Sequence, residues 1–167
     1  MDRTALSYGV LLAAFVLVAM QQASAATATT TFSVQITIQA ECTVSATTLD
    51  FGSNPGVLTA NVDANNSVSV TCTNTTPWTL SLDAGTGSGG TVLLRKMTGP
   101  GAATINYTIY RDPARTEVWG DGTLGTFTVT GTGTGSAQAQ IGYGRVPPQS
   151  APTPGNYLDT ITATVTF

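Results

Sequence analysis

The side chains that most often carry out catalysis or bind metals are few in this sequence and widely spaced. The 167 residues include no His, which excludes the Ser-His-Asp and Cys-His arrangements of nucleophilic catalysis and most zinc and haem sites. The aspartates are scattered rather than gathered into a calcium-binding loop. With 6 Lys+Arg against 9 Asp+Glu, the chain also lacks the basic cluster that binds nucleic acid. We therefore expect no enzyme activity, no cofactor, no metal site and no nucleic-acid partner.

Two short motifs could still be interpreted as chemical sites. Glu117 and Asp121 lie close together in the sequence, and glycosidases use a pair of carboxyl groups. However, Asp121-Gly122 is a typical turn sequence, so we interpret this pair as structural. The glycine-rich segment 85–90 is not followed by the Lys-Ser/Thr of a phosphate-binding loop, and we expect it to be a flexible loop.

The N-terminus has the parts of a secretory signal peptide. An apolar run follows Arg3 and extends to Met20, and Ala23-Ser24-Ala25 matches an A-x-A cleavage site. A run of about 16 residues is shorter than the roughly 20 that a membrane-spanning helix needs. We expect residues 1–25 to be removed on export, leaving a protein with no stable membrane insertion.

Export determines how the two cysteines, Cys42 and Cys72, are interpreted. In an oxidising compartment an isolated pair most simply forms one disulfide. The alternatives are two free thiols or a pair of metal ligands, but no His or third Cys is present to complete a metal site. We predict a Cys42–Cys72 disulfide.

Composition and periodicity favour an all-β fold. Only 9% of the residues are charged and 18 are Gly, which disfavours a helical bundle. Alternating and β-prone segments predict strands at 32–38, 43–51, 67–73, 78–83, 104–111, 124–130, 137–143 and 157–167. Turn-forming clusters separate them, among them 63–66 and 147–156. Roughly seven to nine short strands in one domain indicate an antiparallel sandwich.

Both ends of the mature chain alternate strictly between apolar and polar residues. The apolar positions are Phe32, Val34, Ile36 and Ile38 at one end, and Ile161, Ala163, Val165 and Phe167 at the other. A C-terminal strand must pair on its far edge or leave that edge exposed. Two interpretations remain open: both segments belong to one closed sandwich, or the sandwich lacks a strand and the N-terminal segment completes another copy.

A series of short motifs runs through the mature chain. They are Glu41–Ser45, Leu49–Gly52, Val68–Cys72, Met97, Ile105–Asp112, Trp119–Gly122, Tyr143–Pro147 and Gly155–Thr160. In this order they resemble the spore coat protein U domain family, which includes the subunits of archaic (Csu-type) chaperone–usher pili. The resemblance implies an immunoglobulin-like antiparallel sandwich that is incomplete and is completed by a donor strand from a neighbouring subunit.

The resemblance also implies partners and roles for both ends of the chain. The partners are other copies of the chain or related subunits, a periplasmic chaperone and an outer-membrane usher. Phe32, Val34, Ile36 and Ile38 would plug a neighbour's groove, and the C-terminal strand with Ile161, Ala163, Val165 and Phe167 would border the chain's own groove.

These observations predict a signal peptide over 1–25, a donor segment or first strand over 26–40, and a sandwich domain over 41–167. We expect a secreted structural subunit that polymerises by donor-strand exchange into an extracellular pilus or coat serving adhesion and biofilm formation. One alternative is a self-contained spore or cell coat protein that assembles by lateral contacts. Another is a secreted carbohydrate-binding module that uses Trp78, Trp119 and surface tyrosines.

Overall fold

The protein is described by a computed structural model that covers residues 24–54, 56–150 and 153–167. The chain divides into two units, of which the first ends at Ile36 and the second is Thr37–Phe167. The described part of the first unit, residues 24–36, forms no helix or strand and is exposed. Most of the predicted signal peptide lies outside the described residues. The strands all belong to the second unit.

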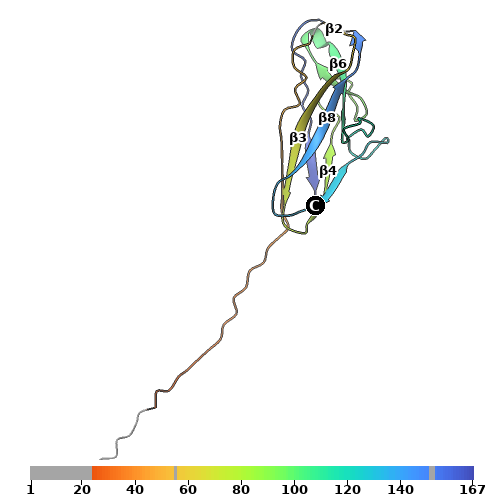
Figure 1. Cartoon of the computed structure of the whole chain (residues 1–167). Coiled ribbons are helices and arrows are strands. Elements are labelled where there is room, and N and C mark those ends of the chain that lie inside the picture. The colour runs from red at the N-terminus through yellow and green to blue at the C-terminus, as the bar shows by residue number, and fades with distance from the viewer. Residues whose placement is uncertain (1–23, 55, 151–152) are drawn as a thin grey trace, which may run out of the picture. The chain divides into compact units, whose positions relative to one another are not determined.

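The second unit is built from two antiparallel sheets and one short ribbon (Figure 1). The larger sheet has the order β1 (Cys42–Ala46), β3 (Val62–Cys72), β8 (Gln138–Val146), β6 (Thr104–Tyr110) and β5 (Arg95–Thr98). The smaller sheet has the order β10 (Ala163–Thr166), β4 (Pro77–Leu82) and β7 (Val129–Thr132). The ribbon pairs β2 (Val57–Leu58) with β9 (Gln149–Ser150), and a single 3₁₀ turn, η1, spans Pro100–Ala102. The predicted all-β, immunoglobulin-like antiparallel sandwich is confirmed.

Alternation along the strands builds the core between the two sheets. β3 contributes Val68, Val70 and Cys72, and β4 contributes Trp78, Leu80 and Leu82, all of them buried. Side chains on one face of a strand recur every second residue, so each strand turns one apolar row inward. Burying each large side chain stabilises the fold by about 1.5–3 kcal/mol before entropy costs.

The predicted disulfide between Cys42 and Cys72 is present. The two residues lie directly opposite each other in the antiparallel pair of β1 and β3. The bond therefore fastens the edge strand β1 to the long strand β3, at a sequence separation of 30 residues. In the chain-entropy description a loop of this length gives roughly 3–4 kcal/mol of stability.

The longest strand differs from its prediction. β3 begins at Val62, so the segment 63–66, which we expected to be a loop, lies inside it. Cross-strand partners explain the difference: Asp63 lies opposite Arg145 and accepts two hydrogen bonds of 2.8 Å from its guanidinium. Polar residues with turn propensity are held in a strand here because tertiary pairing outweighs local preference.

Other strands also differ from the predictions. β5, β2 and β9 are missed, since a strand of Arg-Lys-Met-Thr and two-residue strands carry no alternation signal. The strand expected over 124–130 lies at Val129–Thr132, and segment 32–38 forms no strand in the single chain. The strands expected over 43–51 and 157–167 cover only Cys42–Ala46 and Ala163–Thr166. The residues left over, 47–51 and 157–162, follow irregular paths, apart from an antiparallel bridge between Leu158 and Thr98.

Candidate functional site: an open groove beside two edge strands

An open groove runs along the second unit where residues 46–51 face residues 153–163. One half has a volume of about 340 Å³ and is lined by Ala46, Thr47, Thr48, Leu49, Phe51, Asn66, Val68, Leu82, Met97, Tyr107, Ile109 and 158–161 with Ala163. The other half, of about 460 Å³, includes Leu58, Val62, Ile105, Val146 and residues 153–158. The two halves share Leu49, Phe51, Met97 and Leu158, so they form one continuous depression, which we call the groove.

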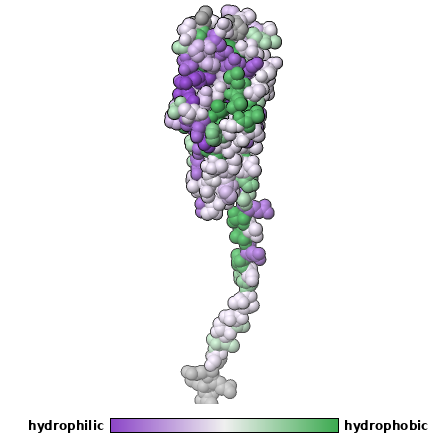
Figure 2. All heavy atoms as spheres, turned by 90° about the vertical axis from the view of Figure 1, so that its right-hand side faces the viewer, coloured by the Kyte–Doolittle hydropathy of each residue, from purple (hydrophilic) through white to green (hydrophobic). Residues whose placement is uncertain are grey.

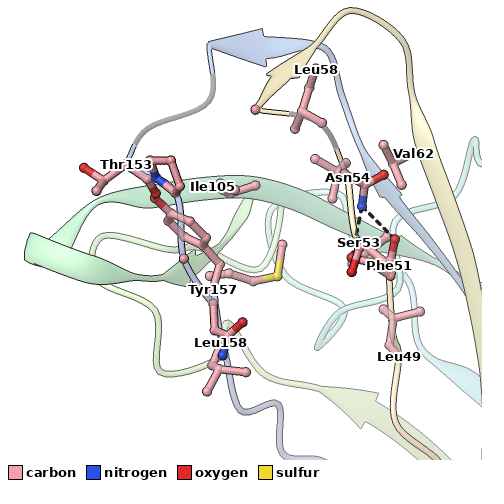
Figure 3. A pocket seen from close by; sticks show the side chains of 17 residues that line it. Leu49, Phe51, Ser53, Asn54, Leu58, Val62, Ile105, Thr153, Tyr157 and Leu158 are labelled. Atoms are coloured by element: carbon pink, nitrogen blue, oxygen red, sulfur yellow. Dashed lines mark hydrogen bonds between the residues drawn. The ribbon is translucent and has the colours of Figure 1, made fainter.

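The floor of the groove is the hydrophobic core itself. Val68, Leu82 and Ile109 are at most 4% exposed and line the groove from beneath. Around them the walls consist of partly buried apolar side chains that pack against the core, among them Leu49, Phe51, Met97, Ile105 and Ile161. Figure 3 shows Leu49, Phe51 and Leu58 on one side of the opening and Tyr157 and Leu158 on the other. The sandwich is therefore open along one side, where the partly buried apolar side chains around its core meet solvent.

Two edge strands contribute residues to the lining of the groove, Ala46 from β1 and Ala163 from β10. β1 is the first strand of the larger sheet and β10 the first of the smaller, and each is hydrogen-bonded to one neighbour among the described residues, β3 and β4 respectively. β1 and β10 lie close to each other. An edge strand presents unpaired N–H and C=O groups, so an added strand can extend the sheet by main-chain hydrogen bonds.

The predicted groove-border residues occupy different positions along this rim. Ile161 and Ala163 line the groove, and both pack against the core together with Val165. Phe167 lies beyond β10 and is 56% exposed. In β10 the polar alternates Thr164 and Thr166 are exposed, so the strand turns its apolar row inward.

The predicted donor residues share an unusual degree of exposure. Phe32, Val34, Ile36 and Ile38 are 84%, 87%, 82% and 71% exposed, the highest values among the large hydrophobic residues described, apart from Leu124 and Leu158. In the space-filling view green hydrophobic residues lie among pale and purple hydrophilic ones along the extended segment (Figure 2). Four exposed apolar side chains at period two form one apolar face of a strand-like segment.

Two aspartates, one lining the groove and one close to its rim, are held by hydrogen bonds. Asp159 lines the groove and accepts hydrogen bonds from the Tyr107 hydroxyl (2.7 Å) and the backbone N–H groups of Thr86 (2.7 Å) and Gly87 (2.9 Å). Burial, together with this hydrogen bond to Asp159, raises the pKa of Tyr107 far above its ordinary value, so its hydroxyl remains a donor. Asp83 accepts from the N–H groups of Thr162 and Gly85; burial opposes ionisation, but these bonds hold its pKa below the usual range.

The remaining chemical motifs have structural roles. Glu117 forms an ion pair with Arg111 at 2.8 Å, and Asp121 accepts hydrogen bonds from Thr123 within its own turn. In the part of the chain that the structure describes, no group of three or more His, Cys, Asp or Glu side chains could hold a metal ion.

The two tryptophans do not form the binding platform that the carbohydrate-binding alternative requires. Trp78 and Trp119 are 3% and 0% exposed, and both belong to the core. Trp119 donates its indole N–H to the Leu80 carbonyl, and Gly131 packs so closely on the Trp78 ring that a side chain there would overlap it. Neither ring can stack on a sugar, so the carbohydrate-binding alternative loses the two tryptophans that it invoked beside surface tyrosines.

Over the described residues 24–54, 56–150 and 153–167, no helix is long and apolar enough to cross a membrane.

Comparisons with known proteins place these features in a family. No curated protein sequence shows significant similarity to the chain. A solved structure with a similar fold is the CsuC–CsuE chaperone–tip adhesion subunit pre-assembly complex from archaic chaperone–usher Csu pili of Acinetobacter baumannii. The match has a TM-score of 0.56 and 21% identity, covering 78% of this chain and 40% of the matched chain. It shows a shared fold, and this chain spans well under half of the other's length. The family model of the Spore Coat Protein U domain matches residues 28–164, and the chain belongs to that family.

Proposed function

We propose that this protein is an exported structural subunit that assembles by donor-strand exchange, in which segment 32–38 of one copy fills the groove of the next. The observation that carries the proposal is a complementarity within one chain. The groove exposes partly buried apolar side chains beside the edge strand β10, and the same chain has an exposed apolar row at strand period. Strand addition uses main-chain pairing for affinity and alternate side chains for specificity.

The energetics of the exchange favour this pairing. Residues 26–40 contain no charged side chain, so the segment can enter an apolar groove without burying a charge. Four donor side chains that change from exposed to buried contribute about 1.5–3 kcal/mol each, or about 6–12 kcal/mol together before entropy costs. A groove left empty would instead keep the partly buried apolar side chains of its walls in contact with water, and a protective partner that covers the groove would prevent this contact.

The comparisons support the proposed setting. The resemblance described above relates this family to pilus subunits. The similar solved structure is a chaperone–subunit complex of a chaperone–usher pilus. We infer that the subunit passes through the periplasm on a chaperone, is assembled at an outer-membrane usher, and ends in an extracellular fibre or coat that serves adhesion and biofilm formation. In this proposal residues 1–25 are the signal peptide, 26–40 the donor segment and 41–167 the acceptor sandwich.

A deletion experiment tests the proposal. Two chains are each expressed with the cognate chaperone and usher: the full chain, and a variant that keeps residues 1–25 but lacks residues 26–38. Cell-surface material is then analysed by electrophoresis in SDS with and without heating. We expect a ladder of heat-sensitive multimers from the full chain, and only chaperone-bound subunit from the deletion variant. Normal assemblies from the deletion variant would refute donor-strand exchange and favour a coat protein that assembles by lateral contacts.

A further inference from the structure

The motif Gly155–Thr160 contains a carboxylate, Asp159, whose position indicates a role beyond the fold. Asp159 belongs to the irregular rim that leads into β10, and it lines the groove. Its side chain joins this rim to two other elements: the β4–β5 loop through the N–H groups of Thr86 and Gly87, and β6 through the Tyr107 hydroxyl. Five donors in all reach this carboxylate, including the Thr86 hydroxyl and the N–H of Thr160.

The loop that receives the carboxylate is shaped for it. Gly85 has a φ of 79°, and a side chain there would overlap the Asp159 carboxylate. Gly87 approaches the Lys96 carbonyl so closely that it also has no room for a side chain. Successive backbone N–H groups in such a turn form a concave anion site. The glycine-rich segment that resembled a phosphate loop thus binds an anion, which is a carboxylate of its own chain.

A second carboxylate, outside the rim, also forms a hydrogen bond to it. Asp83, at the end of β4, accepts hydrogen bonds from the N–H groups of Thr162 (2.9 Å) and Gly85 (3.0 Å). The rim from Leu158 to Thr162 is therefore held near both ends: Asp159 binds the β4–β5 loop and β6 near one end, and Asp83 binds Thr162 at the other. The Arg95 side chain lies fully buried nearby and donates to the carbonyl oxygens of Asp83 and Trp119.

These contacts contribute to the shape of the empty groove. Leu158 and Ile161 line the groove on either side of Asp159, yet Leu158 is 74% exposed and makes little apolar contact that could hold it in place. Polar contacts to a charged group are stronger than neutral ones, because the ionised acceptor strengthens each bond. The rim is thus positioned by these side-chain hydrogen bonds, by the two main-chain hydrogen bonds between Leu158 and Thr98, and by the packing of Ile161 against the core. All of these contacts exist before any donor strand is present.

We propose that Asp159 is a positioning residue for strand acceptance: it holds the rim of the empty groove in the conformation that admits a donor strand. This inference rests on the proposed function. When only a fraction of the molecules has the groove in its binding-competent conformation, the apparent affinity for the donor strand falls by that fraction. Loss of the Asp159 contacts therefore weakens donor-strand binding even if the fold survives. A preformed groove gains affinity by avoiding this ordering cost.

The test measures strand acceptance separately from folding. The parent is the full mature chain carrying Ile36→Asp, which under the proposed function can accept a strand but cannot donate one. A fluorescent peptide of residues 28–40 is mixed with the parent, and its association rate and dissociation constant are measured by anisotropy. Asp159→Asn is then compared with Asp112→Asn, a matched control. Asp112 accepts comparable backbone hydrogen bonds from Thr116 and Glu117 but does not line the groove.

We expect Asp159→Asn to weaken peptide binding at least about tenfold relative to Asp112→Asn, while the two variants melt within a few degrees of each other. Equal peptide binding by the two variants would overturn the positioning role, and so would a binding loss no larger than the loss of folded protein. If Asp159→Asn does not fold, Tyr107→Phe decides, because it removes one donor and keeps the ring: weaker binding supports the proposal and unchanged binding overturns it. A folded parent that binds no peptide would instead refute donor-strand exchange itself.

Discussion

Ile36 lies in the middle of the proposed donor segment, and Ile36→Asp separates assembly from folding. In the single chain this side chain is 82% exposed, so the substitution removes almost no buried apolar surface. Exposed substitutions of this kind change stability by about 0.5 kcal/mol or less. We therefore expect the variant sandwich to fold and to be recovered at the parental yield.

The cost in the joint between two subunits is much larger. The substitution forfeits the burial of one large side chain, about 1.5–3 kcal/mol. It also places an unpaired carboxylate against a groove lined by core residues such as Val68, Leu82 and Ile109, which costs several kcal/mol. Together these terms are comparable to about half or more of the 6–12 kcal/mol that the four donor residues contribute. A loss of about 4 kcal/mol corresponds to roughly a thousandfold weaker joint.

The assay compares three chains expressed with the chaperone and usher: the parent, Ile36→Asp and Thr37→Asp. Soluble chaperone-bound subunit and surface polymer are quantified separately. Thr37 points to the opposite face of the donor strand, because successive side chains alternate, so its aspartate stays in water and polymer should form. Ile36→Asp should give normal subunit and no polymer. Loss of the subunit itself would mean that this segment is a strand of its own domain, and normal polymer would mean that Ile36 does not enter a groove.

Three further predictions concern the sandwich. Cys72→Ser removes the disulfide between β1 and β3 and should lower the free energy of unfolding by roughly 3–4 kcal/mol. Urea denaturation of the unreduced protein measures this change, and an unchanged midpoint would contradict the contribution assigned to the disulfide. The pKa of Asp83 lies below its ordinary value of 3.8, so its stabilising contribution is present above that pH and is lost as the pH falls through the lower folded value. Asp83→Asn should therefore show a smaller drop in melting temperature than the parent between about pH 5 and pH 2, and an identical acid profile would argue against this linkage. Glu117→Ala and Asp121→Ala should leave polymer formation intact, because both carboxylates have partners close by in the sequence and neither lines the groove. A hydrolytic activity that either substitution abolished would show that these carboxylates are catalytic.

The sequence by itself determined the features that depend on composition and short periods. The near absence of charge, the many glycines and the alternating segments predicted an all-β sandwich, since a strand needs only one apolar face to be recognised. The two cysteines predicted their own pairing because no other partner exists. Strands such as β4 and β6 were predicted almost to the residue, because each has turn-forming residues at both ends.

Only the tertiary structure decided which residues border the groove and what holds its rim. Asp63 enters β3 because Arg145 lies across from it, and Arg95 is fully buried in a strand although Arg side chains are rarely buried completely. Asp159 meets Thr86, Gly87 and Tyr107 across separations of 73, 72 and 52 residues, and no local pattern reports such contacts. Periodicity records which face of a strand is apolar, whereas a groove arises from where two sheets fail to close, and that depends on pairings between distant segments.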